Sequence, residues 1–144
     1  MKVLLVHNSY QQPGGEDVVF DLERQILGGA GHEVLAYRRS NWEIEGCTAI
    51  GWLALGKNVV WSKESRREIA TLLNQAKPDL VHAHNTFIMI SPSIYSACKA
   101  AHVPVVQTLH NYRLLCPGAI LFHDGRVCEE CIEHGLWRAV RHAC

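Results

Sequence analysis

The stretch KVLLVHNSYQQPGGEDVVFDLERQIL, residues 2–27, decides the fold class of this chain. Four apolar residues follow Lys2, and a short run of this kind predicts a buried parallel strand. A loop of turn-forming residues comes next, and residues 16–27 then carry apolar side chains at a helical spacing. The apolar segment at residues 34–38 predicts a second strand, so the N-terminal region is predicted to form a β-α-β unit.

The alternation of strands and helices continues as far as residue 111. Capping signals predict a helix beginning at Ser65 and another beginning at Ser91, where Pro92 follows. Apolar runs predict further strands at residues 79–84 and 103–111, and residues 47–56 suit a short helix. We therefore predict an α/β fold with a doubly wound parallel sheet, a class that binds ligands beyond the carboxyl ends of its strands.

The bulk composition narrows the class of function. The chain has 144 residues, with 14 basic and 14 acidic side chains, so no basic excess points to a nucleic-acid partner. The N-terminus lacks the apolar stretch of a secretory signal, and no run approaches the length of a membrane span. We expect a cytoplasmic protein with reduced cysteines.

A histidine followed by an asparagine stands at the end of three predicted strands. The pairs are His7-Asn8, His84-Asn85 and His110-Asn111. Histidine can act as a general base, as a donor to sugar hydroxyls or as a metal ligand, although a single histidine is more often structural. Three at one sheet edge favour a binding or catalytic site. We assign His82 to the opposite face of its strand and give it a structural role.

Gly14 and Gly15 lie in the loop between the first strand and the first helix. Glycines here allow the backbone to approach an anion at the helix N-terminus, although a plain tight turn needs the same residues. The loop has neither the G-x-G-x-x-G nor the P-loop pattern, and the second predicted strand ends in basic rather than acidic residues. Both observations argue against an NAD-binding domain.

The segment after residue 111 is a Cys-rich loop or small subdomain with its own turn signals, including an Asp124-Gly125 pair that suits a hairpin. Its cysteines are Cys116, Cys128, Cys131 and Cys144, and the C-x-x-C pair among them suits tetrahedral zinc. Neighbouring histidines could replace one thiolate; they are His123, His134 and His142. Free thiols and a disulfide or redox pair remain alternatives. We expect Cys47 and Cys98 to pack in the core.

Four segments occur in an order that resembles the N-terminal domain of glycosyltransferase family 4. They are HNSYQQPGGEDVV, GHEV, PDLVHAHN and PVVQTLHNYRLLCPG. The similarity is to bacterial members that build surface polysaccharides. It implies one Rossmann-like half of a GT-B fold and a retaining transfer of sugar from a nucleotide-sugar to an acceptor hydroxyl. It implies no catalytic metal.

The resemblance also assigns roles to single residues. It implies that Gly14 and Gly15 lie near the donor phosphates and that His110 lies close to the transferred sugar. His84 and Asn85 match the end of a strand that faces the cleft. Asn111 is assigned to substrate binding, although many members have aspartate where this chain has Asn111.

The expected organisation is a Rossmann-like acceptor-side domain at residues 1–111 with a Cys-rich segment of the same domain at 112–144. The family's donor-binding domain, with its glutamate pair, is absent from the sequence. We expect little transfer by this chain alone, because positioning and charge stabilisation need both halves. A lipid-linked acceptor would bring the protein to the inner membrane. The alternative is a non-catalytic, zinc-stabilised module that pairs with a separate partner chain.

Overall fold

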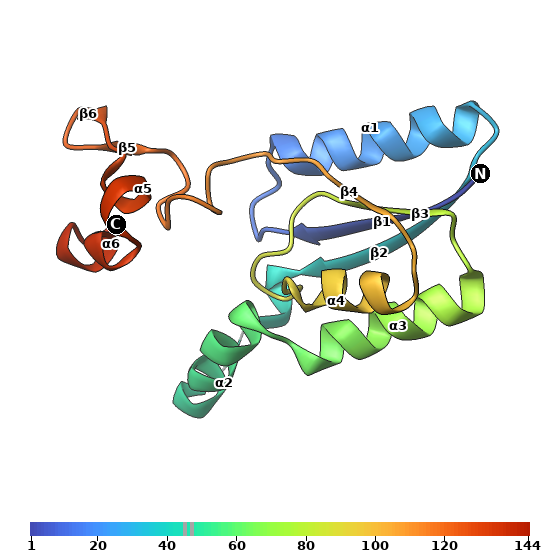
Figure 1. The fold of residues 1–144 in the computed structure, drawn as a ribbon, viewed down its shortest axis with the longest axis horizontal. Helices are drawn as coiled ribbons and strands as arrows, with labels where there is room; N and C mark the ends of the chain where they lie inside the picture. Colours follow the sequence, from blue (N-terminus) through green and yellow to red (C-terminus); the bar gives the residue numbers. More distant parts are fainter. Residues whose placement is uncertain (45, 47) are drawn as a thin grey trace. The chain divides into compact units, whose positions relative to one another are not determined.

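The computed structural model of the chain describes residues 1–44, 46 and 48–144, and these form two compact units, Met1–Thr108 and Leu109–Cys144 (Figure 1). Cys47, which we expected in the core, lies outside the described residues. Cys98 is fully buried in the first unit, as expected. No helix among the described residues is long and apolar enough to cross a membrane.

The first unit is built on a parallel sheet of four strands in the order β2-β1-β3-β4. The strands are β1 (Lys2–Ser9), β2 (Glu33–Ser40), β3 (Leu80–Ala83) and β4 (Val105–Gln107). The predicted α/β class with its Rossmann-like parallel sheet is confirmed. Because the chain runs from β1 to β2 and then returns to the far side of β1, the strand order reverses between β1 and β3. The carboxyl ends of these two strands therefore form the switch point where such sheets bind ligands.

Helices cover both faces of this sheet (Figure 1). α1 (Gly15–Gly29) covers one face, and α3 (Lys63–Ala76) and α4 (Ser93–Ala100) cover the other. Between β2 and α3 the chain also forms a short 3-10 helix, η1 (Asn41–Ile44), and α2 (Ala49–Val60), which projects away from the sheet. Side chains alternate along β1, as strand geometry requires. Val3 and Leu5 pack with Phe20 of α1, whereas Leu4 and Val6 pack with residues of α3 and α4. This alternation also places His7 on the α1 face.

The caps of α3 differ in one respect from the prediction. The helix begins at Lys63, and its N-cap is Ser62, whose side chain accepts a hydrogen bond from the Ser65 amide at 3.1 Å. Ser65 is instead buried inside the first turn and donates its hydroxyl to the carbonyl of Met89. The predicted start at Ser65 was wrong because two serines three residues apart can each cap a helix, and only one has extended backbone.

The second unit contains a small hairpin and two short helices. They are β5 (Phe122–His123), β6 (Arg126–Val127), α5 (Glu130–His134) and α6 (Trp137–Arg141). The predicted hairpin is confirmed: Asp124 and Gly125 both have positive φ angles, of 49° and 76°, as a tight hairpin turn requires. The buried residues of this unit are Cys116, Ala119 and Ala139. It therefore has very little apolar core.

Candidate functional site

The ends of β1 and β3 meet at the switch point, as predicted for two of the three His-Asn pairs. The backbone amide of Asn8 donates to the carbonyl of Asn85 at 2.9 Å, and the Asn85 side chain donates to the carbonyl of Asn8 at 2.8 Å. The rings of His7 and His84 lie edge to face, with centroids 6.1 Å apart. All four residues are buried. These four residues form the buried floor of the switch point, at the carboxyl ends of β1 and β3.

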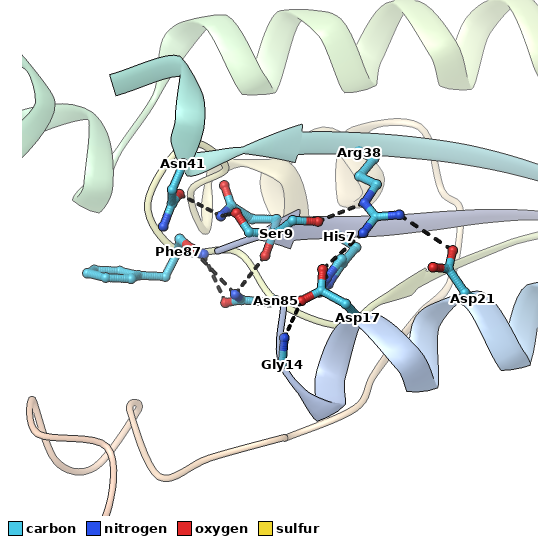
Figure 2. A network of polar contacts seen from close by, with 10 residues as sticks. His7, Ser9, Gly14, Asp17, Asp21, Arg38, Asn41, Asn85 and Phe87 are labelled. Atoms are coloured by element: carbon cyan, nitrogen blue, oxygen red, sulfur yellow. Dashed lines mark hydrogen bonds and ion pairs between the residues drawn. The ribbon is translucent and has the colours of Figure 1, made fainter. Parts of the chain in front are cut away.

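The two asparagines fix the loops around this floor. Asn8 donates to the Asn41 side chain at 2.8 Å and accepts from the Met89 amide at 2.9 Å. Asn85 accepts from the Phe87 amide at 3.1 Å (Figure 2). The amide groups of both asparagines are thus used inside the protein, where they hold η1 and the segment after β3 against the end of β1.

Asp17 joins β1, α1 and β2 through one buried carboxylate (Figure 2). Its Oδ1 lies 3.0 Å from His7 Nε2 and 3.0 Å from Arg38 Nη2, and its Oδ2 accepts the Gly14 amide at 2.9 Å. Burial raises the pKa of Asp17, but hydrogen bonds from Gly14, Ser9 and His7 outweigh it and lower the pKa to about 2. The carboxylate therefore stays ionised, in the first turn of α1, where the helix dipole favours a negative charge.

Sequence reasoning did not identify Asp17 as a member of this site, and it assigned Arg38 to a solvated rim that could also meet a phosphate or an acidic partner. The available signal was an acidic residue three positions after Gly14, the spacing at which a side chain returns to the N-cap amide. Arg38 reaches the network because it lies opposite His7 in the β1–β2 register. That register follows from the fold and is not visible in the sequence of either strand.

The structure places Gly14 at the N-cap and Gly15 at the start of α1. Neither has a positive φ angle, and a Cβ on either would meet no atom within 4 Å. The chain's own packing therefore does not require glycine at either position. The Gly14 amide already donates to Asp17. The anion bound at this helix N-terminus is therefore the protein's own Asp17 carboxylate.

An open cavity of about 410 Å³ lies beside this network, at the carboxyl ends of β1 and β2. It is lined by Ser9, Tyr10, Gln11, Pro13, Asp17, Arg38, Arg39, Ser40, Trp42 and Glu43. Trp42 is 57% exposed, so its ring is available to a ligand. Arg39 is held by Glu43 at 2.7 Å and by Glu68 at 3.3 Å. An exposed aromatic ring beside fixed polar groups suits a polyhydroxylated ligand.

The comparison with known families agrees with this architecture. The family model of Glycosyltransferase Family 4 matches residues 13–139. The chain belongs to this family. No curated protein and no solved structure gives a significant match to the chain. In this family 4 domain, the match covers Gly14 and Gly15, the end of β3 and three of the four cysteines of the second unit, whereas β1 and Cys144 lie outside it.

His82 does not lie where we expected it. Residues two apart on a strand share a face, so His82 and His84 both point toward α1, with ring centroids 4.4 Å apart. His82 Nε2 lies 2.8 Å from Thr108 Oγ1, and His82 Nδ1 lies 3.1 Å from Glu23 Oε2. The assignment of His82 to the opposite face was wrong.

His110 and Asn111 belong to the second unit of the family 4 domain. His110 is half-buried, and the Asn111 side chain accepts the amide of Arg113 at 3.0 Å. This contact closes a local turn just before Cys116. The roles predicted for His110 and Asn111 in sugar transfer stay predictions.

The four cysteines of the second unit line one small cavity of about 190 Å³. His123 and His142 line it too, whereas His134 does not. All four cysteines are free thiols. The four cysteines thus face a common space with two histidines, a donor set that suits zinc.

Two thiols of this cavity have shifted pKa values. Desolvation raises the pKa of Cys116, but backbone N–H groups of residues 118–121 outweigh it and the net shift is downward, which favours the thiolate. Desolvation and the charges of the three other cysteines raise the pKa of Cys144. A divalent cation would relieve this mutual repulsion.

Proposed function

We propose that this chain is the acceptor-side domain of a retaining glycosyltransferase, which moves a sugar from a nucleotide-sugar donor to an acceptor hydroxyl in surface polysaccharide synthesis. In this proposal the domain works with a donor-binding domain and has little activity alone. The observation that carries it is the match to Glycosyltransferase Family 4, on a parallel sheet that has an open cavity with an exposed Trp42 at the carboxyl ends of β1 and β2.

The acceptor sugar occupies the cavity beside Trp42. Aromatic rings stack on the apolar face of a sugar, and Arg38 and Ser9 supply polar groups at its wall. The Asp17 network holds Arg38 in place, since Arg38 also donates to Ser9 Oγ at 2.7 Å. His84 and Asn85 do not line this cavity; in this proposal they contribute to substrate binding through the contact of Asn85 with Asn8 at the end of β1.

The glycine loop faces the donor phosphates in this proposal. Because a Cβ at Gly14 or Gly15 would meet no atom of the described residues within 4 Å, apart from its chain neighbours, a ligand can approach the backbone there. Asp17 also limits how much negative charge this helix terminus can accept. The positive charge that stabilises the leaving phosphate must therefore come chiefly from the donor-binding half.

His110 is the proposed catalytic residue, placed next to the transferred sugar, with Asn111 beside it in substrate binding. The test is His110→Asn in a protein that carries both domains. We expect turnover to fall at least about a hundredfold, the effect of removing one donor that stabilises developing charge. The midpoint of thermal unfolding should change little.

The control is His102→Asn. His102 is exposed at the end of α4 and has a positive φ of 56°, a conformation that asparagine tolerates. This variant should keep wild-type turnover. Equal losses of turnover and stability in His110→Asn would remove the catalytic role of His110.

We also assign a structural zinc to the cysteine cavity, held by Cys116, Cys128, Cys131 and Cys144. The support is the common lining of the cavity and the shifted pKa values of two of its thiols. The metal would have no part in the chemistry of transfer. Its role is to hold the second unit together.

A second candidate function is a non-catalytic module that pairs with a partner chain. The observation that favours it is a set of exposed apolar side chains in the second unit. They are Leu109, Leu114, Leu115, Ile120, Phe122, Val127, Ile132, Leu136, Trp137 and Val140. Exposed apolar side chains that form a contiguous patch mark interaction surfaces. A purified chain that stays monomeric and binds no separately expressed donor-binding domain would count against pairing.

The acceptor class determines where the enzyme works. A lipid-linked acceptor places a cytoplasmic enzyme at the inner membrane, whereas a free sugar acceptor does not. Sedimentation of the chain with vesicles that contain anionic lipid separates these cases. Binding that is lost at high salt supports the membrane-associated form.

A further inference from the structure

Three side chains of α1 and β3 converge on the α1 face of the sheet. Glu23 Oε2 lies 3.1 Å from His82 Nδ1 and 3.2 Å from His84 Nε2. One potential ligand atom from each of the three residues lies within 4.8 Å of the other two. In the part of the chain that the structure describes, no other three histidine, cysteine or carboxylate side chains meet this condition, so the cysteines of the second unit would have to move closer together to share an ion.

These spacings fit the edges of a coordination tetrahedron. Two ligands bound at roughly 2.0–2.1 Å to a tetrahedral ion are about 3.3 Å from one another. Both contacts of Glu23 are close to this value. Two imidazoles and one carboxylate also form the donor set of zinc sites that keep one position open.

The two histidines are already held in the orientation that a metal needs. Thr108 Oγ1 lies 2.8 Å from His82 Nε2, the ring nitrogen that points away from Glu23. Such an outer contact fixes the tautomer of a ligating histidine. The His84 side chain is fully buried and packs edge to face on Phe20, with centroids 5.4 Å apart. The side chains of His82 and His84 would therefore lose little conformational freedom when an ion binds.

An ion can reach these ligands from one side. The Glu23 side chain is 31% exposed and the His82 side chain is 14% exposed, so the cluster opens to solvent along α1. Both imidazoles approach the same carboxylate oxygen, Glu23 Oε2. An ion bound here would take the lone pair of the ring nitrogen that faces it in each histidine, with the ring proton on the other nitrogen.

We propose that Glu23, His82 and His84 bind a divalent first-row transition-metal ion of the zinc type. The fourth position of the ion is left to water or to an anionic ligand. This site is separate from the cysteine cavity and has no assigned part in sugar transfer, so it stands whether or not the proposed function holds.

The test is a count of bound zinc in the full 144-residue chain by native mass spectrometry, at free zinc concentrations set by a chelator of known affinity. We expect Glu23→Gln and His82→Asn each to lower the count by one, because each removes a ligand with little change of shape. Thr108→Val should keep the site and weaken its affinity about tenfold.

The matched control is Glu33→Gln, which removes the same charge at the start of β2, where the Glu33 side chain is 60% exposed and pairs with Lys2. It should leave the count unchanged. NMR of the histidine rings gives a second readout, since zinc should shift the His82 and His84 resonances in wild type and not in Glu23→Gln. A zinc count that is the same in wild type, Glu23→Gln and His82→Asn would overturn the proposal.

Discussion

The two units of the chain are stabilised in different ways. The first unit has apolar clusters on both faces of its sheet, and residues such as Leu5, Phe20 and Ile69 are almost fully buried. The second unit buries Cys116, Ala119 and Ala139 and leaves most of its large apolar side chains exposed. A unit of this size rarely folds on so small a core without a crosslink or a metal. From this comparison we propose that the cysteines of the second unit, through a bound zinc, supply the stability that apolar packing supplies in the first.

The largest expected effect is the loss of the second unit's structure when the proposed zinc is removed. Structural zinc contributes on the order of 10 kcal/mol to small domains that have little core. We expect a chelator, or Cys131→Ser, to abolish protection from hydrogen exchange in residues 109–144 while β1 and β3 stay protected. Hydrogen exchange read by mass spectrometry measures both units in one sample.

Cys98→Ala is the control for this experiment, because Cys98 is buried in the first unit and is not among the residues that line the cysteine cavity. It should leave the second unit protected and the zinc count unchanged. If residues 109–144 stay equally protected in chelator, the second unit does not depend on metal and the contrast between the units fails.

A core substitution in the first unit should destabilise the first unit rather than the second. Phe20 is buried between α1 and the sheet, where it contacts the rings of His7 and His84. We expect Phe20→Ala to lower the free energy of unfolding of this unit by about 3–5 kcal/mol, measured by urea denaturation. Val18→Ala, an exposed position on the same helix, should change it by no more than about 0.5 kcal/mol. A similar loss in both variants would mean that α1 is not held by this core.

Asp17 gives the first unit a smaller, pH-dependent contribution. Its pKa falls from 3.8 to about 2 on folding, so the folded state favours the ionised form. The resulting stability, about 2 kcal/mol, is present above pH 4 and is lost as the pH falls from about 4 to about 2. Asp17→Asn should remove this part of the acid dependence in denaturation curves recorded at several pH values.

Asp21→Asn serves as the comparison for Asp17. Its carboxylate is exposed and lies 3.5 Å from Arg38 Nη1, at the limit of an ion pair. Because exposed pairs contribute little, this variant should keep the acid dependence of the wild type. If Asp17→Asn and Asp21→Asn have the same curves, the buried network does not couple folding to pH.

The sequence was sufficient for features that depend on periodicity. Apolar runs and helical spacing predicted the order of strands and helices, and the Asp124-Gly125 pair predicted the hairpin. The meeting of His7 and His84 followed from the rule that parallel strands end at one edge of a sheet.

Contacts that depend on register or on helix rotation were not visible in the sequence. The Asp17–Arg38 contact needs the β1–β2 register, and the approach of Glu23 to two histidines needs the rotation of α1 over the sheet. His82 was misassigned although strand geometry alone places it on the face of His84. Here the available signal was applied incorrectly.

The most direct test of the whole account is sugar transfer itself. NMR of the anomeric proton can follow a protein that joins this chain to a family 4 donor-binding domain, supplied with a panel of nucleotide-sugars and candidate acceptors. We predict a product with the anomeric configuration of the donor, and no product from the 144-residue chain alone. Inverted product would contradict the retaining mechanism, and turnover by the 144-residue chain alone would contradict its assignment as one half of the enzyme.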